Sequence, residues 1–209
     1  MDLYLITPPE ANKDELSLAR HFLEQGLQKL HIRKPFYNEG ELRQYIMSIP
    51  PVFHARLVLH SAFRLVNEFP SIGIHLRGGD RQNPALVEQV RQMRPTSLST
   101  SFHAWEEIVA EETTYDYVFI SPVFDSISKQ GYKAGIDLAG RGRLMQWSLQ
   151  HKKQLPRVVA LGGINVTNLE LLNENGFEGV AVLGAVWESD NPVAAFNALF
   201  RASGSQAGF

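Results

Sequence analysis

The chain alternates short apolar segments with longer segments of helical periodicity, and this alternation restricts its fold more than any other feature. The segments that read as strands are residues 3–6, 27–33, 56–60, 71–76, 96–101, 115–120, 157–161 and 179–183. Those that read as helices are residues 13–25, 39–47, 62–68, 83–94, 104–112, 137–150 and 192–202, with another beginning near residue 165. Short strands, apolar on both faces and separated by helices, are typical of a parallel sheet covered by helices. Eight such units predict an α/β fold, the (β/α)₈ TIM barrel, in preference to an open doubly wound sheet.

Length and composition set outer limits on function. The 209 residues are 44% hydrophobic and 20% charged, which predicts one globular domain over residues 1–209. A net charge of −2 gives no general electrostatic attraction to nucleic acid. The absence of cysteine excludes disulfides, zinc–thiolate sites and a cysteine nucleophile. No apolar run is long enough to span a membrane and the N-terminus lacks a signal-peptide pattern, so we expect a cytoplasmic protein.

Two strands near the C-terminus end in glycine, which predicts an anion site. Leu161 is followed by Gly162 and Gly163, and Leu183 is followed by Gly184. Residues without a Cβ let a ligand approach the backbone closely, and free N–H groups at the start of a helix attract phosphate. In a (β/α)₈ barrel the loops after strands seven and eight commonly hold a phosphate. We therefore predict a phosphate cradle between these two loops.

Functional side chains of such a barrel project from the C-terminal ends of its strands, at the open end that we call the barrel mouth. Those ends carry hydroxyls, imidazoles, a cationic pair and one well-placed carboxylate, at Thr7, His31, Arg33, Lys34, His60, Ser61, His75, Asp80, Ser101, His103 and Ser121, and loop 121–136 adds Asp125, Ser126, Ser128, Lys129 and Lys133. The set lacks the carboxylate pair of a glycosidase and the clustered ligands of a firm metal site. It predicts anion recognition, with lysine and arginine stabilising negative charge.

The spacing of the seven histidines indicates no metal site. We expect His31 at the barrel mouth as a hydrogen-bond donor and His75 as a hydrogen-bonded core residue. His60 is expected either to bind phosphate or to lie in a surface loop. Asp80, which follows two glycines, is either a turn residue or a metal ligand.

Several short motifs, taken together and in order, resemble those of the thiamine phosphate synthase family, which includes the related thiazole tautomerases. They are LYLIT at 3–7, HIR at 31–33, GIHL at 73–76, SFH at 101–103, DYVFISPVF at 116–124, SISK at 126–129, ALGGI at 160–164 and GVAV at 179–182. The resemblance covers nearly the whole chain. It implies the (β/α)₈ barrel, in agreement with the strand pattern.

The resemblance implies a reaction in which an aminopyrimidine methyl pyrophosphate loses pyrophosphate with the help of Mg²⁺. The nitrogen of a thiazole phosphate then captures the resulting cation. The residues that match the family's functional positions are, for catalysis, Arg33, Ser128 and Lys129; for substrate and phosphate binding, His31, Ser101, Ser126, Gly162, Gly163, Leu183 and Gly184; and for the metal, Asp80.

The chain departs from the family pattern mainly on the pyrophosphate side. His31 replaces the family's glutamine, and Lys34 stands one place earlier than its lysine, so we expect Lys34 on the other face of the strand. His60 and Ser61 replace Asn-Asp, which removes one of two carboxylates for Mg²⁺. Gly184 replaces a serine. The expected cofactor is therefore Mg²⁺ at a weakened site.

Several activities stay open. The SISK loop favours the synthase reaction. The alternative is the tautomerase branch, which acts on thiazole phosphate without Mg²⁺ and uses a histidine at the position of Ser121; a serine is a poor proton shuttle near neutral pH. A third possibility is a divergent member that binds phosphate without catalysis. A sugar-phosphate isomerase would need two acid–base groups at strand ends, and Asp80 alone qualifies. The expected partners are phosphorylated small molecules, and a homodimer is left open.

Overall fold

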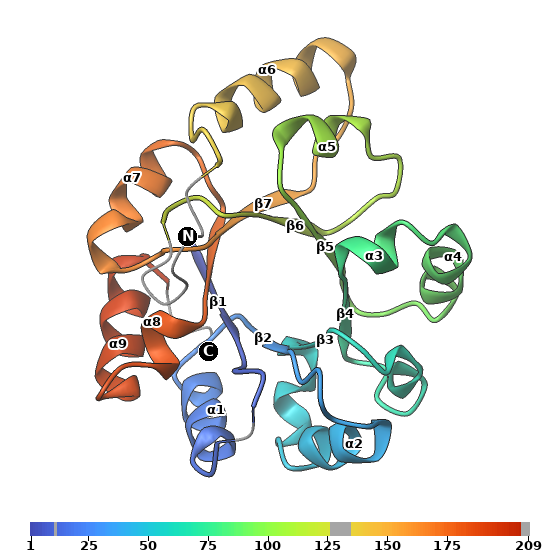
Figure 1. Ribbon diagram of the computed structural model, residues 1–209, viewed down its shortest axis with the longest axis vertical. Helices are drawn as coiled ribbons and strands as arrows, with labels where there is room; N and C mark the ends of the chain where they lie inside the picture. Colours follow the sequence, from blue (N-terminus) through green and yellow to red (C-terminus); the bar gives the residue numbers. More distant parts are fainter. Residues whose placement is uncertain (11, 126–134, 206–209) are drawn as a thin grey trace.

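Each of the eight apolar segments forms a strand that pairs in parallel with the next strand along the chain. The strands are β1 (Asp2–Ile6), β2 (Lys29–Ile32), β3 (Leu57–Leu59), β4 (Gly73–Leu76), β5 (Leu98–Phe102), β6 (Tyr117–Ile120), β7 (Arg157–Leu161) and β8 (Gly179–Val182). Because β8 also pairs with β1, the sheet closes into a barrel (Figure 1). The predicted (β/α)₈ TIM barrel is confirmed. The structure is a computed structural model that describes residues 1–10, 12–125 and 135–205.

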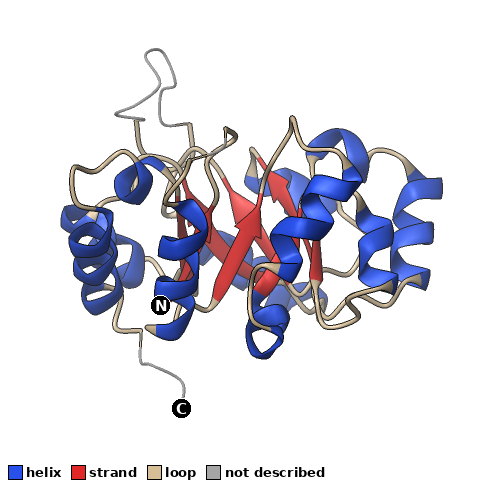
Figure 2. Ribbon diagram, turned by 90° about the horizontal axis from the view of Figure 1, so that it is seen from below, coloured by secondary structure: helices blue, strands red, loops and turns tan. Residues whose placement is uncertain are grey.

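Helices surround the barrel and cover the outer face of the strands (Figure 2). The α-helices are α1 (Glu15–Glu24), α2 (Glu39–Met47), α3 (Gly78–Arg81), α4 (Pro84–Gln92), α5 (Trp105–Ala110), α6 (Gly140–His151), α7 (Leu169–Glu174), α8 (Gly184–Trp187) and α9 (Pro192–Ala202). The 3-10 helices are η1 (Pro51–Arg56), η2 (Phe63–Asn67) and η3 (Val166–Asn168). The main apolar core lies between strands and helices; within it Phe22 of α1 stacks on Phe196 of α9, with ring centroids 4.4 Å apart. In the described part of the chain, no helix combines the length and apolar character that crossing a membrane requires.

Capping residues set the helix starts. Asn38 caps α2 by accepting a hydrogen bond from the Glu41 amide, and Asn83 and Asn191 do the same for α4 and α9, each of which begins with proline. The helix expected over 62–68 is the 3-10 helix η2. The sequence patterns missed α3, α8 and η1, because helices of one or two turns have no apolar periodicity to detect.

The interior of the barrel is divided into an apolar and a polar half. Inward side chains of β1, β6, β7 and β8 form a small apolar cluster, comprising Tyr4, Ile6, Tyr117, Phe119, Val159 and Ala181. The strand register brings His31, Val58 and Gly73 to one level on neighbouring strands. Two residues further along β4, His75 is paired with Ser99 of β5. The expectation that every strand is apolar on both faces was therefore wrong for β2, β4 and β5, whereas β3 is apolar and the polar His60 follows it. Polar side chains are tolerated there because they hydrogen-bond to one another.

Candidate functional site

The glycine turn after β7 lies beside the end of β8, as expected, because Leu161 is paired with Ala181. Gly162 and Gly163 have φ angles of +102° and +64°, which favour glycine. A Cβ at Gly162 would lie 2.9 Å from the Pro122 side chain, and one at Gly163 would overlap the carbonyl oxygen of Asp125. The loop after β6 therefore packs directly on this turn and requires both glycines. The Gly163 amide hydrogen-bonds to no described residue, so it can still meet an anion.

The turn after β8 carries an acidic side chain where the sequence predicted phosphate. The Glu188 carboxylate lies over Gly184, at 3.0 Å from the position that a Cβ would take. Beside it, a hollow of about 450 Å³ is lined by Pro8, Pro9, Glu10, Asn12, Lys13, Leu183, Trp187 and Glu188. A phosphate at Gly184 would meet this negative charge, so its binding requires Glu188 to turn away. Glu188 is exposed and free to do so.

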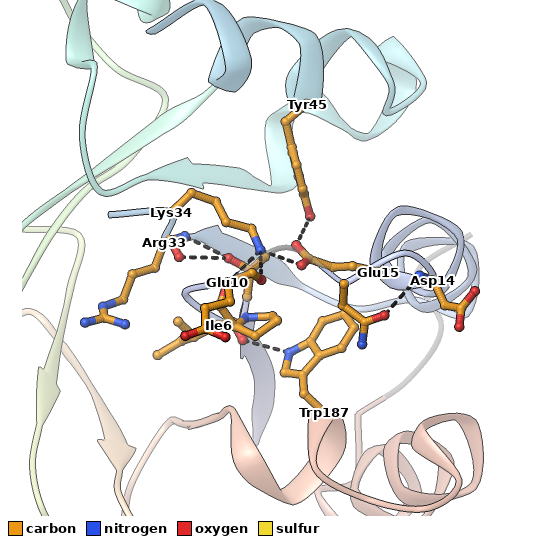
Figure 3. Close-up of polar contacts among 11 residues, drawn as sticks. Ile6, Glu10, Asp14, Glu15, Arg33, Lys34, Tyr45 and Trp187 are labelled. Carbon is orange, nitrogen blue, oxygen red and sulfur yellow. Dashed lines mark hydrogen bonds and ion pairs between the residues drawn. The ribbon is translucent and has the colours of Figure 1, made fainter. Parts of the chain in front are cut away.

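Two neighbouring cations at the end of β2 point in opposite directions (Figure 3). Lys34 is buried outside the barrel, where its Nζ donates to the carbonyl oxygens of Pro8 and Glu10 at 2.7 and 2.9 Å and pairs with Glu15. The prediction that Lys34 lies on the other face is confirmed. The partly buried guanidinium of Arg33 has no hydrogen bond or ion pair with any residue that the structure describes. Arg33 is thus available to an anionic ligand, and Lys34 is structural.

Asp80 lies in the first turn of α3 and is engaged by Arg77 on both carboxylate oxygens. Its Oδ2 accepts from the Arg77 amide at 3.1 Å and from Nε at 2.8 Å, while Oδ1 accepts from Nη2 at 3.2 Å. Thiamine-phosphate synthases are typically Mg²⁺-dependent, and Mg²⁺ prefers several oxygen ligands in octahedral geometry. A carboxylate that already carries a guanidinium, with Ser61 at the second family position, is a poor fit for that ion.

Three histidines from neighbouring strands meet inside the barrel. The Nδ1 atom of His31 on β2 lies 3.0 Å from Nε2 of His60, which directly follows β3. The ring of His60 stacks on that of His75 from β4 with centroids 4.4 Å apart. The expected position of His31 at the barrel mouth was wrong, because its side chain is fully buried. His60 is also buried and lies in no surface loop. His75 is the hydrogen-bonded core residue that was predicted.

Hydrogen bonds with hydroxyl groups orient this histidine cluster, which we define as His31, His60 and His75. The Tyr117 hydroxyl lies 2.9 Å from Nε2 of His31. The hydroxyls of Ser99 and Ser101 each lie 2.9 Å from His75, at Nδ1 and Nε2 respectively. Ser101, predicted on the pyrophosphate side, is thus joined to the cluster.

Burial keeps all three imidazoles uncharged near neutral pH. Desolvation lowers the pKa of His75 to about 3, and the negative charge of Asp80 opposes this only in part. Desolvation is also the main cause that lowers the pKa of His31 and of His60 well below the usual histidine value. Repulsion from the neighbouring histidines is the second cause. The positive charges of Arg33 and Arg77 lower the pKa of His60 further.

The histidine cluster is the part of the site that sequence reasoning missed. Spacing along the chain gave no signal, because 29 residues separate His31 from His60. The usable signal was position along the strands: each histidine is among the last three residues of one of three consecutive predicted strands. Among the other predicted residues, Ser126, Ser128 and Lys129 lie outside the described residues, so their assignment stays a prediction.

One exposed histidine also lies close to a predicted functional position. His103, just after β5, has its Nδ1 atom 2.8 Å from the carbonyl oxygen of Ser121 at the end of β6. Because a carbonyl only accepts, Nδ1 carries a proton and donates it to Ser121. The geometry therefore holds the His103 imidazole beside Ser121, and Nε2 takes no part in this hydrogen bond.

The closed barrel and its polar strand ends define a (β/α)₈-barrel protein with a candidate site at the C-terminal ends of its strands. That site combines buried imidazoles with an arginine that has no partner among the described residues. The family model described as thiamine monophosphate synthase matches residues 3–186, and the chain belongs to that family.

Individual relatives agree with the family. Thiamine-phosphate synthase from Methanospirillum hungatei is 28% identical over 190 residues, which cover 88% of each chain. The protein of the same name from Oceanobacillus iheyensis is 28% identical over 198 residues, covering 90% of this chain and 91% of its own. Among solved structures, thiamine phosphate pyrophosphorylase from Bacteroides thetaiotaomicron has a TM-score of 0.71 at 29% identity, with 97% of this chain and 95% of that one covered. The Pyrococcus furiosus protein of that name is 22% identical, with a TM-score of 0.77, and the match covers 97% of this chain and 95% of that one. This likeness supports the fold.

Proposed function

We propose that this protein is an enzyme of thiamine biosynthesis that joins an aminopyrimidine methyl pyrophosphate to a thiazole phosphate and releases pyrophosphate. Family membership supports the pathway and the class of substrate. The single observation that carries the reaction is Arg33: its guanidinium has no partner among the described residues and bears on the buried interior beside His60. A guanidinium is the side chain best suited to bind a pyrophosphate through two parallel hydrogen bonds.

In this proposal Arg33 acts on the leaving group. The bond between the pyrimidine methylene carbon and the pyrophosphate oxygen breaks, and the electron pair leaves with the oxygen. Arg33 stabilises the negative charge that develops there, and the thiazole nitrogen donates its lone pair to the methylene carbon. Lys129 and the hydroxyls of Ser126 and Ser128 are assigned to the same pyrophosphate from the sequence alone. No step is assigned to Mg²⁺, because the donor set around Asp80 does not suit it.

The test is coupling of both substrates by the purified protein, with and without Mg²⁺. Arg33→Met is expected to lower kcat/KM about a hundredfold, the effect of removing one charge-stabilising donor. The matched control is Arg20→Met, because Arg20 is an exposed arginine that only meets the Ser48 carbonyl on the outer surface. Coupling by the Arg33 variant at the wild-type rate would contradict the proposed role, and no coupling by the wild type would contradict the reaction itself.

Thiazole tautomerisation is the second candidate, and His103 is the observation that favours it. Proton transfer on a thiazole ring needs an acid–base group, and the imidazole of His103 lies beside Ser121, the position at which that branch carries histidine. On this hypothesis His103→Gln abolishes tautomer conversion, whereas Ser121→Ala retains it. The reverse order of effects, measured by following conversion of the thiazole phosphate, would exclude His103.

A further inference from the structure

The histidine cluster brings three nitrogen ligands together inside the barrel. One nitrogen from each of His31, His60 and His75 lies within 4.8 Å of the other two, and all three side chains are buried. We propose that these three imidazoles bind one divalent transition-metal ion of the zinc class. The site depends only on these side chains and stands whichever reaction the protein performs.

The distances suit a metal ion after a small adjustment. A Zn–N bond of about 2.0–2.1 Å places two nitrogens of a tetrahedral site about 3.4 Å apart. Nδ1 of His31 and Nε2 of His60 are already 3.0 Å apart. The widest pair, at up to 4.8 Å, must close by up to about 1.4 Å to reach that spacing.

The hydrogen-bond partners identify the nitrogen that each ring offers. When the Ser99 hydroxyl donates to the carbonyl oxygen of Ile74 at 3.3 Å, its oxygen accepts from the Nδ1–H of His75 at 2.9 Å. Nε2 of His75 then has the lone pair, and the Ser101 hydroxyl is its present donor. A metal takes the place of that donor without disturbing the bond to Ser99.

His31 has a matching outer partner. With Nδ1 directed at the ion, its Nε2–H donates to the hydroxyl oxygen of Tyr117 at 2.9 Å. Metal-bound histidines usually donate their second ring N–H to a fixed acceptor, which sets the tautomer and the ring orientation. Two of the three rings in the cluster therefore already have the outer hydrogen bond that such a ligand needs.

The donor set selects the class of metal. Three neutral imidazoles without a carboxylate suit zinc, cobalt, nickel or copper and disfavour Mg²⁺ and Ca²⁺, which prefer oxygen. Three protein ligands leave a fourth position open, as in catalytic zinc sites. Neutral ligands do not offset the charge of the ion, and Arg33 and Arg77 add positive charge nearby. An anionic oxygen, from hydroxide or from a phosphate, is the fourth ligand that compensates this charge.

Metal binding by the full-length protein is the direct test. After treatment with a chelator, the protein is titrated with Zn²⁺ by calorimetry and with Co²⁺ by visible absorption. We expect one ion per chain and the intense d–d bands of a tetrahedral Co²⁺ site. Absence of stoichiometric binding at micromolar metal would overturn the proposal and leave the cluster as a hydrogen-bonded core.

Variants locate the ion. His60→Asn and His75→Gln are expected to weaken Zn²⁺ binding by more than about a hundredfold, since loss even of outer partners costs 10- to 100-fold. His103→Asn is the matched control, because it removes an exposed imidazole that lies outside the cluster, and it should bind Zn²⁺ as the wild type does. Undiminished affinity in both cluster variants would place the ion elsewhere and refute the site.

A measurement on the wild type removes the dependence on variants that fail to fold. X-ray absorption at the zinc edge of the loaded protein should show three imidazole ligands and one lighter oxygen ligand. A shell of oxygen ligands alone would contradict the assignment. Circular dichroism of each variant establishes whether a loss of binding comes from the ligand or from unfolding.

Discussion

At the scale of single residues, the buried ion pair between Lys34 and Glu15 is a contact whose loss should strongly lower stability. Both side chains are almost fully buried, and the Tyr45 hydroxyl donates to the second Glu15 oxygen at 2.9 Å. Glu15→Ala would leave the Lys34 charge buried without its counter-ion. Because an uncompensated buried charge typically costs about 3–5 kcal/mol, we expect a loss of that size in the free energy of unfolding, measured by urea denaturation.

The control for this prediction is an exposed carboxylate that also pairs with a cation. Glu39→Ala removes one partner of Arg43 on the surface, and Arg43 keeps its bond to Glu68, so the urea midpoint should stay unchanged. The double variant Glu15→Leu with Lys34→Met should recover much of the loss, since apolar residues of similar size replace buried ion pairs well. A double variant less stable than Glu15→Ala would contradict the charge explanation.

Residue roles could be predicted from the sequence only where strand alternation decides them. Alternation placed Lys34 on the face opposite Arg33, and the structure agrees. It could not show that Lys34 would meet Glu15, because that contact depends on how α1 packs beside β2. The three histidines were each recognised at a strand end, but their convergence depends on the register of β2, β3 and β4, which no local pattern specifies.

At the scale of elements, the glycine turn after β7 holds the loop that follows β6. The Val123 amide donates to the carbonyl of Leu161 at 3.1 Å, and the Phe124 amide to that of Gly162 at 3.2 Å. Gly163→Ala combines an unfavourable positive φ with overlap on the Asp125 carbonyl. We expect it to destabilise the protein by about 2–4 kcal/mol in thermal or urea unfolding.

Two other glycines allow the cost of a positive φ to be measured separately from the cost of steric overlap. Gly176, after α7, also has a positive φ, of +77°, but a Cβ there would meet nothing within 4 Å. Gly176→Ala should therefore cost only about 1–2 kcal/mol. Gly142, exposed on α6, has no such strain, and Gly142→Ala should stabilise by about 0.5–1 kcal/mol. Equal losses at Gly163 and Gly176 would show that the loop adapts to the added methyl group.

Elements with a strong apolar period were predictable from the sequence, and helices of one or two turns were not. All eight strands follow from short apolar runs, because a parallel strand in a barrel must present apolar residues to the helices outside it. Helix α3 depends on the Asp80 side chain accepting from the Arg77 amide, a contact that gives no periodic signal. The same bond is what withdraws Asp80 from the metal role that the family resemblance implied.

At the scale of the whole molecule, burying three neutral histidines links stability to pH. In the unfolded chain a histidine has a pKa of about 6.5. In the folded, metal-free protein burial lowers all three values, that of His75 to about 3. As the pH falls below about 6.5, the unfolded chain therefore binds protons at these histidines while the folded protein does not, and the free energy of unfolding decreases. The stability is fully present above about pH 6.5 and continues to decline as the pH falls towards the pKa of the folded state.

The slope of this decline is what can be measured. Each histidine that stays uncharged in the folded protein contributes about 1.4 kcal/mol per pH unit, so three give about 4 kcal/mol per unit. An ordinary stability of about 5–15 kcal/mol is then exhausted within about one to four units. Urea midpoints of chelator-treated protein, taken from neutral pH downwards, should therefore fall steeply below about pH 6. His75→Gln removes one titrating group and should reduce the slope by about a third. His103→Gln, which alters an exposed imidazole, should leave the slope unchanged. A wild-type slope smaller than that expected for one histidine would mean that water enters the cluster and that the histidines become charged in the folded protein.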